Sequence, residues 1–144
     1  MSRFVLHADG AARGNPGPAG AGAVLFDERG EIVAELRRHL GRATNNRAEY
    51  EAVVMGLEEA RRRGVEEIVV RLDSELIVKQ LRGEYRVRNR ALAPLAQRAV
   101  RLLSEFPSAR LEHVPRERNA VADRLANEAI DRGAAVRGDR GGRG

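Results

Sequence analysis

The amino-acid sequence predicts an α/β fold in which three antiparallel strands precede two strands that are each reached through helices. Short apolar runs separated by turn residues fill the first forty residues. The apolar period then changes to that of a helix, and two further short apolar runs alternate with helical segments. The predicted order is β-β-β-α-β-α-α-β-α. Because a strand that follows a helical crossover joins its sheet in parallel, the result is a five-stranded mixed sheet.

The three early strands are predicted at residues 3–8, 21–26 and 31–40. The segment from Gly10 to Gly22 is rich in glycine and proline, which excludes a helix and predicts a turn that leads into the second strand. Residues 27–30 (Asp-Glu-Arg-Gly) predict a hairpin turn between the second and third strands. The first three strands therefore form an antiparallel meander.

The later part of the chain predicts four helices and two strands. The helices are expected at residues 46–63, 74–81, 89–105 and 119–131, and the strands at 66–72 and 110–114. Gly64 follows the last turn of the first helix, at a position where glycine commonly ends helices. Pro94 is compatible only with the first turn or so of the third helix, where its missing N–H costs little.

Length and composition predict one soluble domain. The chain has 144 residues, enough to bury a full core, and its 42% hydrophobic content is close to the globular average. It contains no cysteine, which excludes disulfides and thiolate metal sites, so any metal must be held by oxygen or imidazole. We expect neither a signal peptide nor a membrane span, because the apolar stretches are too short. The expectation is a cytoplasmic monomer without a membrane partner.

Positive charge is concentrated in two segments. The formal net charge is +5. Residues 132–144 contain four arginines against one aspartate, and residues 82–90 contain four arginines against one glutamate. A localised basic strip favours a polyanionic partner, and the alternative is a solvated surface in an arginine-rich chain, which applies more to the tail than to residues 82–90. We predict a folded domain at residues 1–131 and a disordered basic tail at 132–144.

Four acidic residues lie where the predicted fold delivers side chains to one point. Asp9 and Asp73 close the first and fourth strands, and Glu49 and Asp123 each lie one turn into a helix. If the fourth strand pairs with the first, the backbones of Asp9 and Asp73 are about 5 Å apart. The carboxyl ends of strands in such sheets are also where ligands bind.

Converging carboxylates favour a divalent cation. Two ionised acids one strand spacing apart repel each other unless a cation offsets their charge, and Mg²⁺ prefers hard oxygen ligands. The positive helix ends beside Glu49 and Asp123 are expected to help keep the acids deprotonated near neutral pH. Two ions could activate a water and stabilise the leaving oxygen in a displacement at phosphorus, so no protein nucleophile is required.

Each acid also has an ordinary structural explanation when taken alone. Asp9 is in a position typical of a turn, Asp73 of a helix cap, and Glu49 and Asp123 of exposed first-turn acids. These explanations do not account for four acids at element ends that one topology brings together. The set predicts a metal site in an enzyme that acts on phosphate esters.

Four segments resemble the sequence motifs of type 1 ribonucleases H. The first runs from Asp9 to Gly20 (DGAARGNPGPAG) and the second from Thr44 to Glu49 (TNNRAE). The third is Asp73-Ser74, and the fourth runs from Asn119 to Asp123 (NAVAD). Their order and spacing match the family, and the resemblance covers about residues 1–131. The first two motifs are specific, whereas Asp-Ser alone is weak evidence.

The resemblance implies a ribonuclease H-like fold, with helices on both faces of the five-stranded mixed sheet. It also implies endonucleolytic cleavage of the RNA strand of an RNA/DNA hybrid, which leaves 3′-hydroxyl and 5′-phosphate ends. Two Mg²⁺ ions, or Mn²⁺ in their place, would be held by Asp9 as shared ligand together with Glu49, Asp73 and Asp123.

The resemblance also implies substrate contacts. Asn15, Asn45 and Asn46 would lie along the minor groove, where amides can bond to the 2′-hydroxyls that distinguish RNA from DNA. Thr44 is a candidate for contact with a phosphate of the DNA strand. Helix capping by Asn45 or Asn46 is an alternative that is compatible with this role.

The sequence departs from the family pattern at three places. The loop before Asp123, residues 115–118 (Pro-Arg-Glu-Arg), lacks the histidine that many members carry, and His113 and Glu117 are the candidate substitutes. Glu75 occupies a position that is often Gln. The basic protrusion that some members insert before the long helix is absent, and an arginine strip is expected to replace it in part; the strip consists of Arg82, Arg86, Arg88 and Arg90.

Two other functions remain open from the sequence. The same nuclease could accept a broader range of substrates that includes double-stranded RNA, because the loop and the protrusion differ from the family pattern. A hybrid-binding module without catalysis would require the loss of an acid, and all four are present. Related folds that act on DNA fit less well because they lack the Asn-Asn motif.

Overall fold

A computed structural model describes the backbone of residues 3–138 and the side chains of residues 3–133. The elements are β1 (Arg3–Ala12), β2 (Gly17–Phe26), β3 (Ile32–Ala43), α1 (Asn45–Arg62), β4 (Glu67–Leu72), α2 (Glu75–Leu81), α3 (Ala93–Ser104), β5 (Ser108–His113), the 3₁₀ turn η1 (Arg116–Asn119) and α4 (Ala120–Gly138). The strand order is β3-β2-β1-β4-β5. The first three strands pair antiparallel, and β4 and β5 add in parallel, which confirms the predicted mixed sheet.

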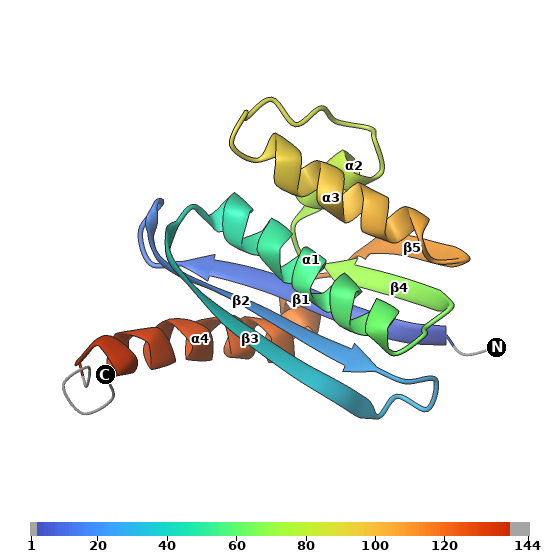
Figure 1. Cartoon of the computed structure of the whole chain (residues 1–144), viewed down its shortest axis with the longest axis horizontal. Helices are drawn as coiled ribbons and strands as arrows, with labels where there is room; N and C mark the ends of the chain where they lie inside the picture. Colours follow the sequence, from blue (N-terminus) through green and yellow to red (C-terminus); the bar gives the residue numbers. More distant parts are fainter. Residues whose placement is uncertain (1–2, 139–144) are drawn as a thin grey trace.

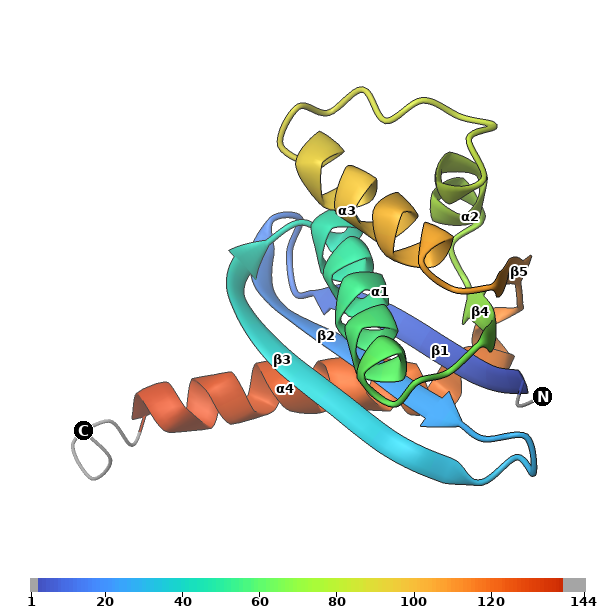
Figure 2. The same ribbon diagram turned by 45° about the vertical axis from the view of Figure 1, so that its right-hand side comes forward.

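The sheet separates two helical layers. Figures 1 and 2 show α1, α2 and α3 over one face and α4 across the other. The larger core lies between α1 and the sheet, where Leu6, Tyr50 and Leu57 are fully buried. On the opposite face, Leu125 and Ile130 of α4 are buried against the strands. None of the helices in residues 3–138 is long and apolar enough to cross a membrane.

The glycine-rich segment after Asp9 is mostly strand, not the predicted turn. β1 continues to Ala12 and β2 begins at Gly17, and Asp9 pairs with Gly22 inside the ladder. Tertiary packing explains the glycine content, because a Cβ atom on Gly22 would lie 2.4 Å from the carbonyl oxygen of Ala122 in α4. The small residues thus allow α4 to pack closely on the strand pair. The glycine content of this segment reflects that packing and not a turn.

Two predicted helix boundaries were wrong. α3 begins at Ala93, not at residue 89, because the side-chain oxygen of Asn89 accepts a hydrogen bond from the Ala91 N–H and forms a turn. α4 continues to Gly138, seven residues beyond the predicted end of this helix at residue 131. Gly133 lies against His39 of β3, because a Cβ atom on Gly133 would be only 2.1 Å from the His39 ring. The helix continues beyond Gly133. The remainder of the predicted tail lies outside the described residues.

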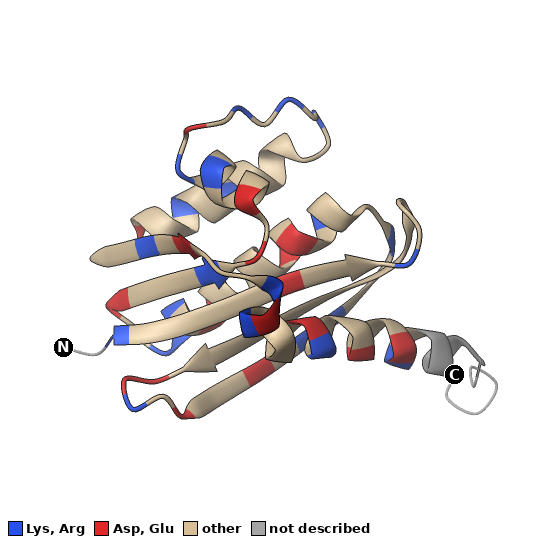
Figure 3. Ribbon diagram, turned by 180° about the vertical axis from the view of Figure 1, so that it is seen from behind, with Lys and Arg blue, Asp and Glu red and all other residues tan. Residues whose placement is uncertain are grey.

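Ion pairs cover the outer surface of α4. Figure 3 shows acidic and basic residues interleaved along this helix. Glu128 pairs with Arg37 of β3 at 2.8 Å and with Arg124 at 2.9 Å, and Asp131 pairs with Arg13 at 2.8 Å. Such exposed pairs contribute little stability individually. They do show that much of the positive charge on this face is already matched by acids.

Candidate active site

The four predicted acids converge on one cleft. Asp9 lies in β1 and Asp73 directly follows β4, each two residues beyond the paired His7 and Arg71 of these parallel strands. Carboxylate oxygens of Asp9, Asp73 and Glu49 lie within 4.8 Å of one another. Asp123 lies outside this group of three but lines the same cleft, whose volume is about 430 Å³.

Glu49 reaches the cluster because α1 packs directly against β1. A Cβ atom on Gly10 would lie 2.2 Å from the carbonyl carbon of Ala48 and 2.3 Å from the backbone nitrogen of Glu49. Only glycine therefore permits this approach. The helix is capped by Thr44, whose hydroxyl accepts from the Arg47 N–H at 3.2 Å, so capping by the asparagines that follow it was the wrong interpretation.

Asp123 reaches the cleft through a matching close contact on the opposite face of the sheet. Gly22 lies beside Asp9 in the strand pair, and a Cβ atom there would be 2.4 Å from both the Ala122 oxygen and the Ala126 nitrogen. The first turn of α4 therefore lies on the backbone next to Asp9. This contact brings Asp123 to the cleft from the layer opposite α1.

Asp73 is held by Asn119, which the sequence interpretation treated as the start of a helix and as the first residue of the fourth motif, without a role at the site. Asn119 is 1% exposed, and its amide nitrogen donates to Asp73 Oδ2 at 3.2 Å and to the Ala8 carbonyl at 2.9 Å. Its amide oxygen faces His7 at 3.1 Å. A buried amide requires several partners, and these partners come from segments more than forty residues distant in the sequence.

Burial and mutual repulsion make the acids hard to ionise together. Burial raises the pKa of Asp9 to about 8, and the carboxyls of Asp73, Glu49 and Asp123 add to the rise. Burial and the charge of Asp73 raise the pKa of Glu49 to about 8 as well. The expectation that helix ends keep the acids deprotonated near neutral pH was therefore wrong for Asp9 and Glu49, because desolvation and like charges outweigh the helix dipole.

The cluster fits a hard divalent cation. Its donor atoms are all carboxylate oxygens, which Mg²⁺ and Mn²⁺ accept. A cation would also offset the repulsion that raises the two pKa values. A larger concavity of about 650 Å³ lies elsewhere, along β1 toward its amino end, but none of the four acids lines it.

Arg116 is a further residue of the cleft that sequence reasoning missed. It lies in η1, lines the cleft, and its charge opposes the rise in the pKa of Glu49. The two candidates for the missing histidine do not line the cleft: His113 ends β5, and Glu117 lines a separate hollow beside His7. Arg116 lies between these two candidates in the sequence.

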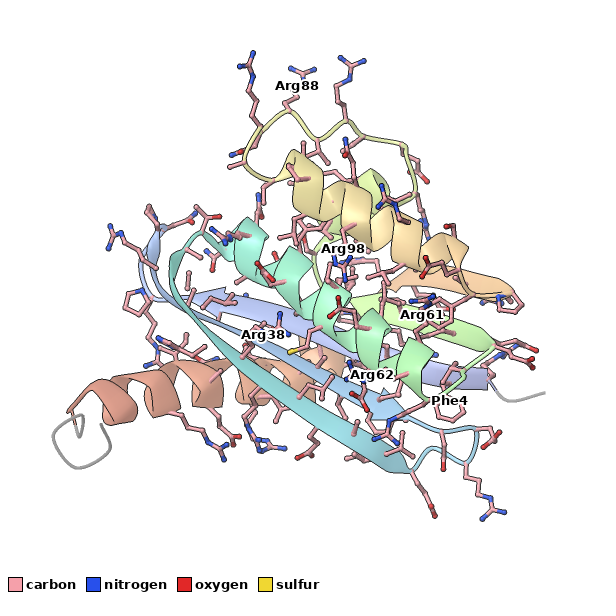
Figure 4. All side chains as sticks on the ribbon, in the orientation of Figure 1. Phe4, Arg38, Arg61, Arg62, Arg88 and Arg98 are labelled. Atoms are coloured by element: carbon pink, nitrogen blue, oxygen red, sulfur yellow. The ribbon has the colours of Figure 1, made fainter. Side chains whose placement is uncertain are left out.

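Of the predicted substrate residues, Asn45 lines the cleft and is hydrogen-bonded to Asn15. The Asn45 N–H donates to the Asn15 side-chain oxygen at 3.1 Å, and the Asn45 side-chain oxygen accepts from the Ala12 N–H at 3.0 Å. Thr44 precedes Asn45, and Asn46 is half-buried in the first turn of α1. Arg86 and Arg88 are exposed on the segment between α2 and α3, and Arg88 points away from the body of the protein (Figure 4).

Comparison with known proteins identifies the family. The reverse transcriptase-like family model matches residues 7–129. The ribonuclease HI of Halobacterium salinarum is 49% identical over 129 residues, and the crystal structure of RNase H1 from this archaeon superimposes with a TM-score of 0.86 over 90% of this chain and 98% of that one. The chain belongs to the type 1 ribonuclease H family.

Two more ribonuclease H relatives extend the comparison. The crystal structure of LC11-RNase H1 in complex with RNA/DNA hybrid is 43% identical, with a TM-score of 0.85 over 91% of this chain and 99% of that one. The bifunctional protein Rv2228c of Mycobacterium tuberculosis is 45% identical over 133 residues, which are 92% of this chain. The chain spans only 36% of that relative and 65% of the Halobacterium ribonuclease HI.

Proposed function

We propose that this ribonuclease H is an endonuclease that hydrolyses the RNA strand of RNA/DNA hybrids and leaves 5′-phosphate and 3′-hydroxyl ends. The observation that supports this most directly is the convergence of Asp9, Glu49 and Asp73 within 4.8 Å in a cleft that Asp123 also lines. The hybrid bound to LC11-RNase H1, a relative of nearly equal length, supports the choice of substrate.

The four acids would hold two divalent ions, Mg²⁺ or Mn²⁺. Bound ions supply an activated water and stabilise the leaving oxygen of an in-line displacement at phosphorus. Asp9 is the proposed shared ligand, because the family resemblance implies this role and a carboxylate oxygen of Asp9 lies within 4.8 Å of those of Glu49 and Asp73, in the cleft that Asp123 also lines. Glu49, Asp73 and Asp123 complete the two sites from three separate elements. The charge of Arg116 would favour the ionised form of the Glu49 carboxyl.

The amide groups at the rim are suited to the minor groove of the hybrid. The side-chain oxygens of Asn15 and Asn45 already accept backbone hydrogen bonds, which leaves their N–H₂ groups as donors. Such donors match the 2′-hydroxyl oxygens and the acceptors on base edges. Asn46 would extend this row, and the hydroxyl hydrogen of Thr44 remains for a phosphate oxygen, since the cap uses only its oxygen.

Arg86 and Arg88 would contact backbone phosphates beyond the cleft. Both are exposed, and neither forms an ion pair within the described part of the chain, in contrast to the arginines near α4. Phosphate contacts of this kind position a duplex without reading its sequence. Because one chain supplies all four acids, we propose a monomer, and we place its action in the cytoplasm.

An end-labelled cleavage assay tests the proposal. One sequence is presented as RNA/DNA hybrid, double-stranded RNA, double-stranded DNA and single-stranded RNA, each with Mg²⁺, with Mn²⁺ and with EDTA. Metal-dependent cutting of only the RNA strand of the hybrid is the expected result. Cutting of double-stranded RNA as well would show a broader nuclease, and hybrid binding without cleavage would contradict the proposed activity.

A further inference from the structure

Three hydrogen bonds determine how the buried Asn119 side chain is turned. Its two short contacts to Asp73 Oδ2 and to the Ala8 carbonyl both involve oxygen atoms that accept. Both therefore require the amide N–H₂ group. The amide oxygen is then the group that lies 3.1 Å from Nδ1 of His7.

His7 must supply the donor in this third contact. An amide oxygen only accepts, so the proton lies on Nδ1 of His7 and its N–H donates to Asn119. This bond is the third contact that fixes the amide of Asn119 in place. If the donor were removed, the amide oxygen would lose its partner, and the N–H₂ group would be held less firmly against the Asp73 carboxylate.

The ring of His7 is itself fixed in place. It lies in β1 on the α4 side of the sheet, two residues before Asp9, and contacts Phe26 of β2 edge to face with ring centroids 5.6 Å apart. Asp73, by contrast, follows the last residue of β4, so the ladder does not hold its backbone. Its carboxyl therefore depends on side-chain contacts for its orientation.

We propose that His7 and Asn119 form a positioning pair for Asp73. The pair holds Oδ2 of Asp73 through one amide N–H and keeps the carboxylate aimed into the cleft, ready for a divalent cation. The inference rests on the proposed role of Asp73 as a metal ligand. Groups that orient a ligand in this way typically change metal affinity by about 10- to 100-fold when they are lost.

Titration of the metal-free protein with Mn²⁺ tests the pair without substrate. Binding is measured as the loss of the electron paramagnetic resonance signal of the free ion. Asn119→Asp has the same shape but replaces the donor by an acceptor, and should weaken Mn²⁺ binding by about 10-fold or more. His7→Phe keeps a ring against Phe26 but removes the donor, and should weaken binding severalfold. His7→Asn returns an amide N–H near the position of Nδ1, and should restore most of the affinity.

Two control variants separate positioning from packing and from ligation. Val5→Ala alters the neighbouring residue on the same face of β1 and should leave Mn²⁺ affinity unchanged. Asp73→Asn removes the proposed ligand itself. If Asp73→Asn retained wild-type affinity, the proposed ligand set would be wrong; if Asp73→Asn lost affinity while Asn119→Asp and His7→Phe did not, only the positioning pair would be wrong.

Nitrogen-15 NMR of the imidazole gives a second readout, which is independent of metal and of any loss of folding in the variants. The wild-type neutral ring should carry its proton on Nδ1. A proton on Nε2 would overturn the pair, as would equal Mn²⁺ affinities for His7→Phe and His7→Asn.

Discussion

Arg116 acts on Glu49 across the cleft, and its charge opposes the burial and the repulsion that raise the pKa of this carboxyl to about 8. Removal of the Arg116 guanidinium should therefore raise the pKa of Glu49 further, so that a smaller fraction of the Glu49 carboxyl is ionised at neutral pH. We expect Arg116→Gln to move the acidic limb of the pH–rate profile to higher pH, by up to about one unit. Arg116→Lys should move it less, since the charge is kept.

Arg118 provides the matched control for this prediction. It lies two residues further along η1 and lines the hollow beside His7 instead of the acid cleft. Arg118→Gln should leave the profile in place. If Arg116→Gln lowered the rate equally at every pH, its role would not be the ionisation of Glu49.

The raised pKa values of Asp9 and Glu49 predict an unusual pH dependence of stability. A carboxyl whose pKa is near 4 when unfolded and about 8 when folded binds its proton in the folded state between these values. The contribution of these two carboxyls to the stability of the folded state is then greatest below about pH 4, and it falls as the pH rises toward 8. We expect the free energy of unfolding of the metal-free protein to fall by roughly 5 kcal/mol or more over this range, since one pKa unit corresponds to about 1.4 kcal/mol for each group.

Urea unfolding at several pH values, with EDTA or with Mg²⁺, measures this effect. Mg²⁺ should flatten the dependence, because a bound cation keeps the carboxyls ionised in the folded state. Asp9→Asn should also flatten the pH dependence of stability, because it removes one of the two carboxyls. The same variant should abolish cleavage while hybrid binding persists. A metal-free protein that becomes more stable between pH 5 and 8 would contradict the prediction.

Gly22→Ala should displace α4 and with it Asp123. The new methyl group would lie 2.4 Å from two backbone atoms of α4, and backbone cannot move aside as the end of a side chain can. We expect a loss of about 1–3 kcal/mol in the free energy of unfolding, and a fall in cleavage that exceeds any fall in hybrid binding. Denaturant unfolding and cleavage rates are the two measurements.

Gly30→Ala is a useful comparison for this glycine. Gly30 has a positive φ of 79° but no atom within 4 Å of the position of a Cβ. Alanine there should cost only about 1–2 kcal/mol of backbone strain and should leave cleavage by the folded protein unchanged. Equal losses of cleavage in the two variants would indicate a general effect of destabilisation.

The double substitution Arg86→Ala with Arg88→Ala should weaken hybrid binding and reduce its salt dependence. Each lost phosphate contact should lower the slope of log K against log salt by about one. Fluorescence anisotropy at several salt concentrations measures this, and the cut positions should not move. Arg62→Ala with Arg63→Ala, which removes arginines already paired with Glu59, is the control and should leave the slope unchanged.

The order of strands and the identity of the four acids could be predicted because both depend on local signals. Apolar periodicity and the helical crossovers determine the mixed sheet, and each acid lies at the end of a strand or near the start of a helix. The extended strands around Gly22 could not be predicted in this way, since the glycines there serve contact with a helix a hundred residues later.

The supporting residues of the site were also beyond sequence reasoning. The bonds of Asn119 to His7 and to Asp73 join segments 112 and 46 residues apart, and they depend on the rotation of side chains that no periodicity records. Arg116 was visible in the short loop before Asp123, but its direction toward Glu49 follows only from the turn that η1 makes.

The two helices that carry Glu49 and Asp123 lie on opposite faces of the sheet, so all four acids line one cleft only while both helices are docked (Figures 1 and 2). Cations held by the four acids would join the two layers, and release of either helix would lose the free energy with which the ions bind. Ligation would then protect the whole domain against local opening, by RT ln(1 + [M]/Kd) for an ion at concentration [M]. The supply of divalent metal in the cell would thereby govern the lifetime of the protein against proteases as well as its catalysis.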